Sequence, residues 1–335
     1  MSINPNSSNS QKKRIEYLDF CKVLAIFLVT VAHCAQRISG IHFPELLLSK
    51  DSFISINMPI FMIASGFVMN VDKMRQTRTK DYLLSKFIRL IIPMTSWYVV
   101  LCLVSYQPPQ LNLYWEIYWY LGALFVCLAT VKILADYISN NVYVCVISIV
   151  LLTFIPLILL ERSCFMIPFL WTGYFLRSQI SRIGKLSMLV MLIVYLTMYY
   201  YWDVGYSIYS TPFHIWDVNY NSLFAMFFRL MIGIVGGVLV ISLSKILIEK
   251  KHFGWMLYVA KYGPYTLVFY TMSFVLNTIL ARVLWHIHFY VQTPGLLDLV
   301  SIAVTILMMI LMYYFQIFSQ KNNWLRLVFL GEANT

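Results

Sequence analysis

The chain has 335 residues, of which 60% are hydrophobic and only 12% are charged, and its formal net charge is +11. An ordinary soluble domain carries about 25% charged residues. The composition therefore excludes a soluble globular protein and predicts an integral membrane protein. Membrane topology and contact with anionic lipid account for the excess of Lys and Arg, so no nucleic-acid partner is expected.

Apolar stretches of about 20 residues, long enough to cross the hydrocarbon core of a bilayer, recur along the chain. We identify ten, of which the fourth and the sixth are the shortest. The pattern predicts an all-α polytopic membrane protein with about ten transmembrane helices. The stretches cover roughly residues 17–36, 53–70, 87–105, 115–131, 142–160, 164–177, 186–202, 223–243, 263–281 and 296–318.

The distribution of Lys and Arg predicts the orientation in the membrane. If the N-terminus is cytoplasmic, the outer side receives only Arg37, Lys50, Arg162, Arg229 and Arg282 of the 25 basic residues. The positive-inside rule accepts this arrangement, so both termini are predicted to be cytoplasmic. We expect a disordered cytoplasmic N-terminus over residues 1–13, a single transmembrane domain over 14–320 and a cytoplasmic tail over 321–335.

The first predicted span carries three ionisable side chains, Asp19, Lys22 and His33. At about 100° per residue, Lys22 and His33 lie within roughly 20° of the same helix face, and Asp19 lies about 40° from His33. Ionisable groups inside a span usually face the protein interior or a polar pathway, and this favours a functional site. The alternative is a buried histidine beside a lysine that extends to the lipid headgroups.

Two further segments of interest are predicted to lie at or near the cytoplasmic side of the membrane. Ser65-Gly66, near the end of the second span, permits close approach of another helix backbone. The segment 73–80 is strongly basic, with Arg75 and Arg78, and Arg89 follows it. Such cations can bind a phosphorylated ligand by charge-assisted hydrogen bonds. Ordinary positive-inside anchoring explains them equally well.

The outer side offers aromatic and acidic residues. Aromatic rings beside hydrogen-bonding carboxylates suit a sugar, whereas Trp and Tyr are also common at membrane interfaces. Arg229 lies about two turns inside the eighth span and is expected to face the interior. Neither Cys nor His residues show metal-ligand spacing, so we predict no metal site and no disulfide framework. The candidate sugar-binding residues are Asp203, Tyr209, Trp216 and Asp217 in the outer loop, with Glu116 and Trp119 at the fourth span.

A set of short motifs resembles the integral membrane acyltransferase type 3 family, which modifies bacterial cell-surface carbohydrates. Each motif is weak alone, but their order and spacing cover nearly the whole chain. The first is Arg14-x4-Asp19-x2-Lys22-x10-His33. The others are Met58-Pro59-Ile60-Phe61 leading into Ser65-Gly66-Phe67, Lys86-x2-Arg89-Leu90-x2-Pro93, Trp119-Tyr120-Leu121, Phe169-x3-Gly173-Tyr174 and Thr266-Leu267-x2-Tyr270.

The sequence departs from the family pattern at two positions. Many members have arginine where Lys22 stands, which keeps the charge but loses the bidentate fork. Some relatives have a histidine at the end of the late motif, where this chain has Ser273. The resemblance carries functional roles to His33 and Lys22, and further to Asp19, Ser65, Arg89 and Arg229.

The resemblance implies transfer of an acyl group, most simply acetyl, from cytoplasmic acetyl-CoA to a hydroxyl of a surface glycan or its lipid-linked precursor. No permanently bound cofactor is implied, and the location is the bacterial inner membrane. His33 would be the general base or a transient acyl carrier. Lys22, Ser65, Arg75, Arg78 and Arg89 would bind the donor, and Arg229 would stabilise the developing oxyanion.

Two other classes of protein remain open on the residues alone. One is a secondary transporter or a flippase for lipid-linked glycans, in which the charges of the first span form a relay. Broken helices and repeat symmetry would indicate that class. The other is a purely structural membrane subunit, which leaves the aligned polar residues unexplained. The oligomeric state and the acceptor are not specified by the sequence.

Overall fold

The computed structural model describes residues 14–40, 52–154, 161–206, 220–250 and 253–332, and within these ranges the chain is helical without a strand. This confirms the all-α prediction. The 3-10 and π segments are η1 (Phe87–Ile91), η2 (Val204–Tyr206) and η4 (Gly263–Tyr265). The α-helices are α1 (Glu16–Ser39), α2 (Ser52–Phe67), α3 (Val71–Gln76), α4 (Thr79–Lys86), α5 (Ile92–Ser105), α6 (Leu111–Ile117), α7 (Trp119–Tyr137), α8 (Asn141–Phe154), α9 (Glu161–Gln179), α10 (Lys185–Tyr200), α11 (Tyr220–Glu249), α12 (Gly254–Ala260), α13 (Thr266–Ile287), α14 (Pro294–Gln320) and α15 (Asn323–Leu330).

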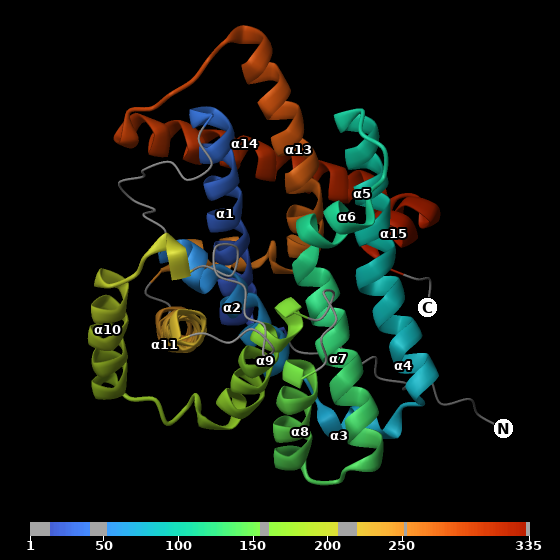
Figure 1. Cartoon of the computed structure of the whole chain (residues 1–335), viewed down its shortest axis with the longest axis vertical. Helices are drawn as coiled ribbons and strands as arrows, with labels where there is room; N and C mark the ends of the chain where they lie inside the picture. Colours follow the sequence, from blue (N-terminus) through green and yellow to red (C-terminus); the bar gives the residue numbers. More distant parts are fainter. Residues whose placement is uncertain (1–13, 41–51, 155–160, 207–219, 251–252, 333–335) are drawn as a thin grey trace, which may run out of the picture.

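Helix α1 lies at the centre of the molecule (Figure 1). It packs against α2, α11, α12, α13 and α14. The neighbouring helices are not parallel, because α11 is seen end-on in Figure 1 while α1 and α13 run upward and α14 crosses them. Most of α1 is buried, since its apolar residues cover more than one face. The polar side chains of α1 are therefore held inside the protein at fixed positions.

Six helical segments are long and apolar enough to cross a membrane, counted over the described ranges. They are Glu16–Ser39, Thr79–Ser105, Trp119–Tyr137, Tyr220–Glu249, Gly254–Ile287 and Pro294–Gln320. Three apolar helices, Ser55–Phe67, Asn141–Phe154 and Lys185–Tyr200, are shorter. Each of the ten predicted spans overlaps a helix of the described ranges, but the number of crossings and the side of the termini stay predictions.

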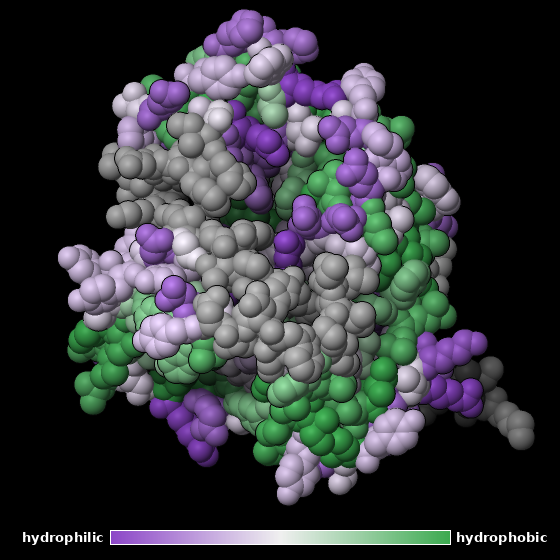
Figure 2. Space-filling view, viewed as in Figure 1, coloured by the Kyte–Doolittle hydropathy of each residue, from purple (hydrophilic) through white to green (hydrophobic). Residues whose placement is uncertain are grey.

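Apolar side chains cover much of the outer surface, as expected for contact with lipid chains. Exposed examples are Val150 on α8, Ile193 on α10 and Leu103 on α5. Figure 2 shows hydrophobic areas on the sides and the lower part of the molecule. A surface of this kind is stable in a bilayer and would aggregate in water. The chain is a multi-pass membrane protein.

Two glycines allow α2 and α9 to pack backbone to backbone. A Cβ atom on Gly66 would overlap the carbonyl oxygen of Leu170, and a Cβ atom on Gly173 would overlap that of Ile63. Small residues at a helix crossing permit this close approach, which gains dispersion energy along both backbones. The predicted role of Gly66 is confirmed, and Gly173 is its counterpart on the other helix.

A wide turn interrupts the helical run from Thr79 to Ser105. Segment η1 is a π-helical turn, and Pro93 follows it at the start of α5. The proline ring clashes with the carbonyl group four residues earlier in a regular helix, and that carbonyl belongs to Arg89. The turn widens around this position, and Gly331 packs closely on the Arg89 backbone.

Candidate functional site

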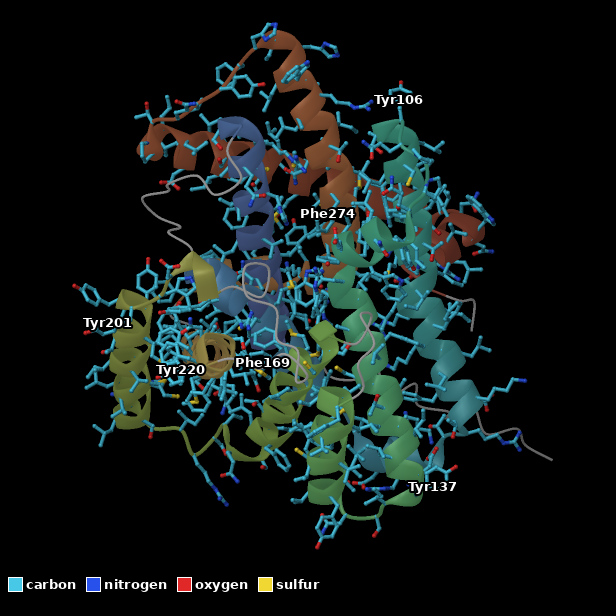
Figure 3. The ribbon with its side chains drawn as sticks, viewed as in Figure 1. Tyr106, Tyr137, Phe169, Tyr201, Tyr220 and Phe274 are labelled. Carbon is cyan, nitrogen blue, oxygen red and sulfur yellow. The ribbon has the colours of Figure 1, made fainter. Side chains whose placement is uncertain are left out.

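His33 lies on the side of α1 that faces α13. Its ring centroid is 5.2 Å from that of Phe274, which Figure 3 shows in the interior between the two helices. Nδ1 of His33 is 3.2 Å from Oε1 of Gln36, one turn further along α1. An amide oxygen only accepts a hydrogen bond, so in the tautomer with the proton on Nδ1 this nitrogen donates a hydrogen bond to Gln36. In that tautomer Nε2 holds the lone pair that a general base requires.

The charged residues near the start of α1 form one cluster. Asp19, which is 8% exposed, accepts two hydrogen bonds from Arg14 at 3.1 and 3.0 Å and one from Lys22 at 3.1 Å. Arg14 also donates to the carbonyl of Ala260, and Gly263 packs directly on Asp19. Asp19 and His33 therefore both face the α12–α13 segment, which confirms that they share a side of α1.

Tyrosine rings surround the region of Phe274. Tyr118 and Tyr270 have ring centroids 5.3 and 5.5 Å from Phe274, and the Tyr118 hydroxyl donates to the carbonyl of Thr271 at 3.1 Å. Tyr120 lies 5.8 Å from Tyr270. Trp119, a predicted sugar-binding residue, is buried, and the guanidinium of Arg162 lies 5.5 Å from the centroid of its ring. Glu116, the other predicted residue nearby, is exposed.

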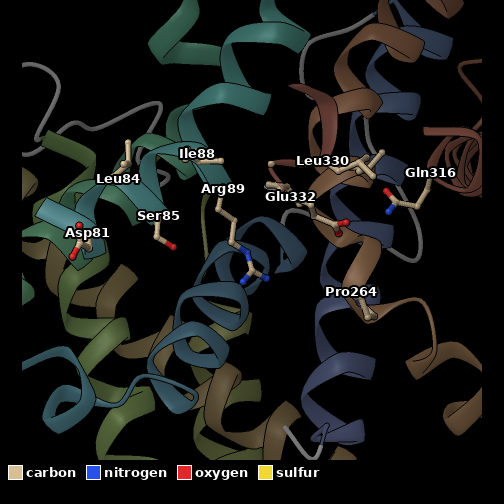
Figure 4. Close-up of a pocket in the computed structure, with 12 residues that line it drawn as sticks. Asp81, Leu84, Ser85, Ile88, Arg89, Pro264, Gln316, Leu330 and Glu332 are labelled. Carbon is tan, nitrogen blue, oxygen red and sulfur yellow. The ribbon is translucent and has the colours of Figure 1, made fainter. Parts of the chain in front are cut away.

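A cleft of about 580 Å³ opens near the start of α13. Figure 4 shows Arg89 reaching into it from η1, with Gln316 of α14 on the opposite wall. Gln316 is 2% exposed, and its Oε1 atom has no hydrogen-bond partner among the residues that the structure describes. The cleft is lined by Asp81, Leu84, Ser85, Ile88, Arg89, Pro264, Leu267, Val268, Gln316, Leu330, Gly331 and Glu332.

A second, smaller pocket of about 250 Å³ lies at the other ends of α1 and α13. It is lined by Arg37, Thr278, Ala281, Arg282, Trp285 and His286. None of these was a predicted site residue. Arg37 stands one turn after His33, but a lone arginine at the end of a span resembles an interfacial anchor, so its place in a pocket could not be predicted from its position in the sequence.

One face of α13 joins the cleft, His33 and the pocket. Residues 267, 271, 274, 278, 281, 282 and 285 follow a three-to-four-residue spacing and lie within about 60° of one direction on the helix. Leu267 belongs to the cleft, Phe274 contacts His33, and Arg282 belongs to the pocket. The helix rises about 10 Å from Leu267 to Phe274 and about 6 Å from Phe274 to Thr278.

Other predicted site residues have local partners. Arg75 donates to the carbonyls of Ala135, Ile138 and Ser139, to Asn141 and to Asp72, so it holds the end of α7 in place. Ser65 donates to the carbonyl of Phe61, within α2. Arg78 is exposed at the start of α4. Of the predicted donor-binding cations, Arg89 is the one that lines the cleft.

The remaining predicted residues lie on α11 and in the segment before it. Arg229 is 3% exposed, and its guanidinium is 5.2 Å from the ring centroid of Phe165. It faces the interior, as predicted, and its role in catalysis stays a prediction. Asp203 is exposed and accepts a hydrogen bond from the backbone of Gly205. Tyr209, Trp216 and Asp217 lie outside the described residues.

Comparison with known proteins identifies the family. The model of the acyltransferase domain of the type 3 family matches residues 15–314, which is most of the chain. No curated protein and no solved structure matches the sequence. The match includes α1 with His33, the η1 turn with Arg89 and all of α13, and it ends before Gln316 and α15. The chain belongs to the type 3 acyltransferase family and is a membrane acyltransferase.

Proposed function

We propose that the protein transfers an acyl group, in the simplest case acetyl, from acyl-CoA to a hydroxyl of a cell-surface glycan or its lipid-linked precursor. The observation that carries this proposal is the continuous face of α13, which joins the cleft at Arg89, His33 and the smaller pocket. The positive-inside pattern assigns the cleft to the cytoplasmic side and the pocket to the outer side of a bacterial inner membrane.

The cleft is suited to the donor. Arg89 can pair with phosphate oxygens of coenzyme A by charge-assisted hydrogen bonds. Oε1 of Gln316 is buried, and an unpaired buried acceptor is costly. An amide N–H of the pantetheine arm would satisfy it. The thioester would then lie along α13 toward His33, over a rise of about 10 Å from Leu267 to Phe274.

The reaction requires one proton acceptor. Nε2 of His33 takes the proton of the acceptor hydroxyl while the hydroxyl oxygen attacks the thioester carbonyl carbon. The new C–O bond forms, the C–S bond breaks, and the leaving thiolate takes the proton from the imidazolium. The hydrogen bond from Nδ1 to Gln36 holds the ring in the tautomer that begins this sequence.

A transfer assay with purified protein tests the proposal. The full-length protein is placed in lipid nanodiscs with radiolabelled acetyl-CoA and with glycan extracted from a strain that lacks this gene. We expect label in the glycan and a mass increase equal to acetyl groups. Absence of transfer from acetyl-CoA, propionyl-CoA and succinyl-CoA alike, with protein that is folded in the nanodisc, would contradict an acyl-CoA donor.

A further inference from the structure

The pocket at the C-terminal ends of α1 and α13 has a strongly biased charge. Three of its six lining residues, Arg37, Arg282 and His286, are basic or can become cationic, and none of the six is acidic. Arg37 comes from α1 and the other two come from α13, so the two helices bring cationic groups to one opening. A concave site lined by one sign of charge concentrates ions of the opposite sign.

The arginines are arranged to bind an oxyanion. The guanidinium of Arg282 lies 4.5 Å from the ring centroid of Tyr106, which Figure 3 labels at the end of α5. A cation–π contact is attractive and favours this position of the guanidinium. Arg37 is exposed beside the opening. A planar guanidinium matches carboxylate and phosphate oxygens with two parallel hydrogen bonds.

Trp285 gives the pocket an apolar wall. Its side chain is 66% exposed, although most tryptophans bury their large rings. An exposed indole beside cations suits a ligand with both an apolar face and a negative charge. The rings of sugar acids and of phosphorylated sugars have both. Figure 2 shows hydrophilic side chains around this end of α13, above the apolar part of the surface.

The pocket lies close to the proposed base. Arg37 follows His33 by one turn on α1, a rise of about 6 Å, and Thr278 follows Phe274 by one turn on α13. Because Phe274 contacts the His33 ring, the pocket begins about one helical turn beyond the imidazole. An anionic group bound between Arg37 and Arg282 would leave a hydroxyl of the same or the next sugar pointing toward His33.

We propose that this pocket binds the anionic group of the acceptor, and therefore that the acceptor is an acidic glycan or a phosphate-linked glycan precursor. This inference rests on the proposed function, because it names the substrate class of the same reaction. Arg37 and Arg282 bind the oxyanion, and Trp285 packs on the sugar ring.

The test uses the nanodisc assay with four preparations of the glycan from the strain that lacks the gene. The glycan is used untreated, after carboxyl reduction, after removal of phosphate, and after both treatments. Arg37→Gln is compared with wild type, because Arg37 is exposed and its loss leaves packing intact. Arg37→Lys retains the charge, and Arg182→Gln removes an exposed cation that does not line the pocket.

We expect Arg37→Gln to raise the apparent KM for untreated glycan about tenfold, as for loss of one charged hydrogen-bond partner, and to leave the KM for acetyl-CoA unchanged. The KM of Arg37→Lys for untreated glycan should lie between those of wild type and Arg37→Gln, and the KM of Arg182→Gln should equal that of wild type. Whichever treatment removes the recognised anion should raise the wild-type KM at least to the Arg37→Gln value, because the contacts of both arginines are then lost. The treatment that acts then identifies carboxylate or phosphate as the ligand.

Two results would overturn the pocket assignment. One is a wild-type KM that is the same for untreated and doubly treated glycan. The other is an Arg37→Gln variant that is less active than wild type only in nanodiscs that contain phosphatidylglycerol in place of phosphatidylcholine. That result would identify a bilayer headgroup as the occupant of the pocket. In both cases wild-type transfer from acetyl-CoA still proceeds, so these failures are distinct from failure of the proposed function.

Discussion

At the scale of single residues, the proposed mechanism rests on the pair of His33 and Gln36. Gln36→Leu removes the acceptor for Nδ1–H and should lower kcat about 10- to 100-fold, as loss of an orienting partner commonly does. Gln36→Glu keeps an acceptor for Nδ1–H and should retain more activity than Gln36→Leu. Equal loss of kcat in the two variants would show that this hydrogen bond does not orient His33.

A second residue-scale prediction concerns the donor cleft. Glu332 is an exposed carboxylate that lines the cleft beside Arg89, because the preceding Gly331 packs on the Arg89 backbone, and it would repel a phosphate that enters there. Glu332→Gln should lower the apparent KM for acetyl-CoA roughly two- to fivefold, because exposed charge pairs contribute up to about 1 kcal/mol. Glu249→Gln is the control, since Glu249 is exposed and does not line the cleft. A raised KM in Glu332→Gln would place the phosphates elsewhere.

At the scale of elements, the crossing of α2 and α9 depends on glycine. Gly66→Ala would place a methyl group against the carbonyl of Leu170 and push the helices apart. Overpacking of this kind typically costs about 1–3 kcal/mol, so the melting temperature in detergent should fall. Gly184→Ala is the matched control, because nothing lies within 4 Å of the added Cβ. Equal melting temperatures for the two variants would contradict the close approach.

Helix α15 shows what lies beyond the family match. The ring centroid of Trp97 on α5 lies 5.1 Å from that of Phe315 and 5.1 Å from that of Phe329. These contacts hold α15 beside α5 and α14. Asn322 caps the start of the helix with its side chain. The segment after residue 314 therefore completes the lining of the cleft that contains Arg89, with Gln316 and Glu332 in it.

At the scale of the whole molecule, topology is the open prediction. Reporter fusions after Lys80, Lys185 and Lys251 should report cytoplasm, and fusions near Gln110 and Ser210 should report the outside. This arrangement would place Arg89 and the pocket with Arg37 on opposite sides of the membrane. Inverted reports at two or more positions would reject the orientation and, with it, cytoplasmic entry of the donor.

Local sequence patterns predicted the helices and the shared side of Asp19 and His33, because helical periodicity determines which residues share a face. They did not predict the pocket, since Arg37 and Arg282 are brought together only by the packing of α1 on α13. They also did not predict the role of Arg75, whose partners at the end of α7 are 60 or more residues away. The wide turn at Arg89 was missed because the apolar pattern continues through Pro93.

The central claim is that His33 performs the acyl transfer. The most direct measurement is the rate of acetyl transfer by His33→Ala and His33→Gln in nanodiscs, together with coenzyme A binding and melting temperature. Loss of a general base typically lowers the rate about 100- to 10,000-fold, so we expect that loss in both variants with donor binding and folding retained. Transfer at about a third of the wild-type rate or more, in either folded variant, would contradict the account.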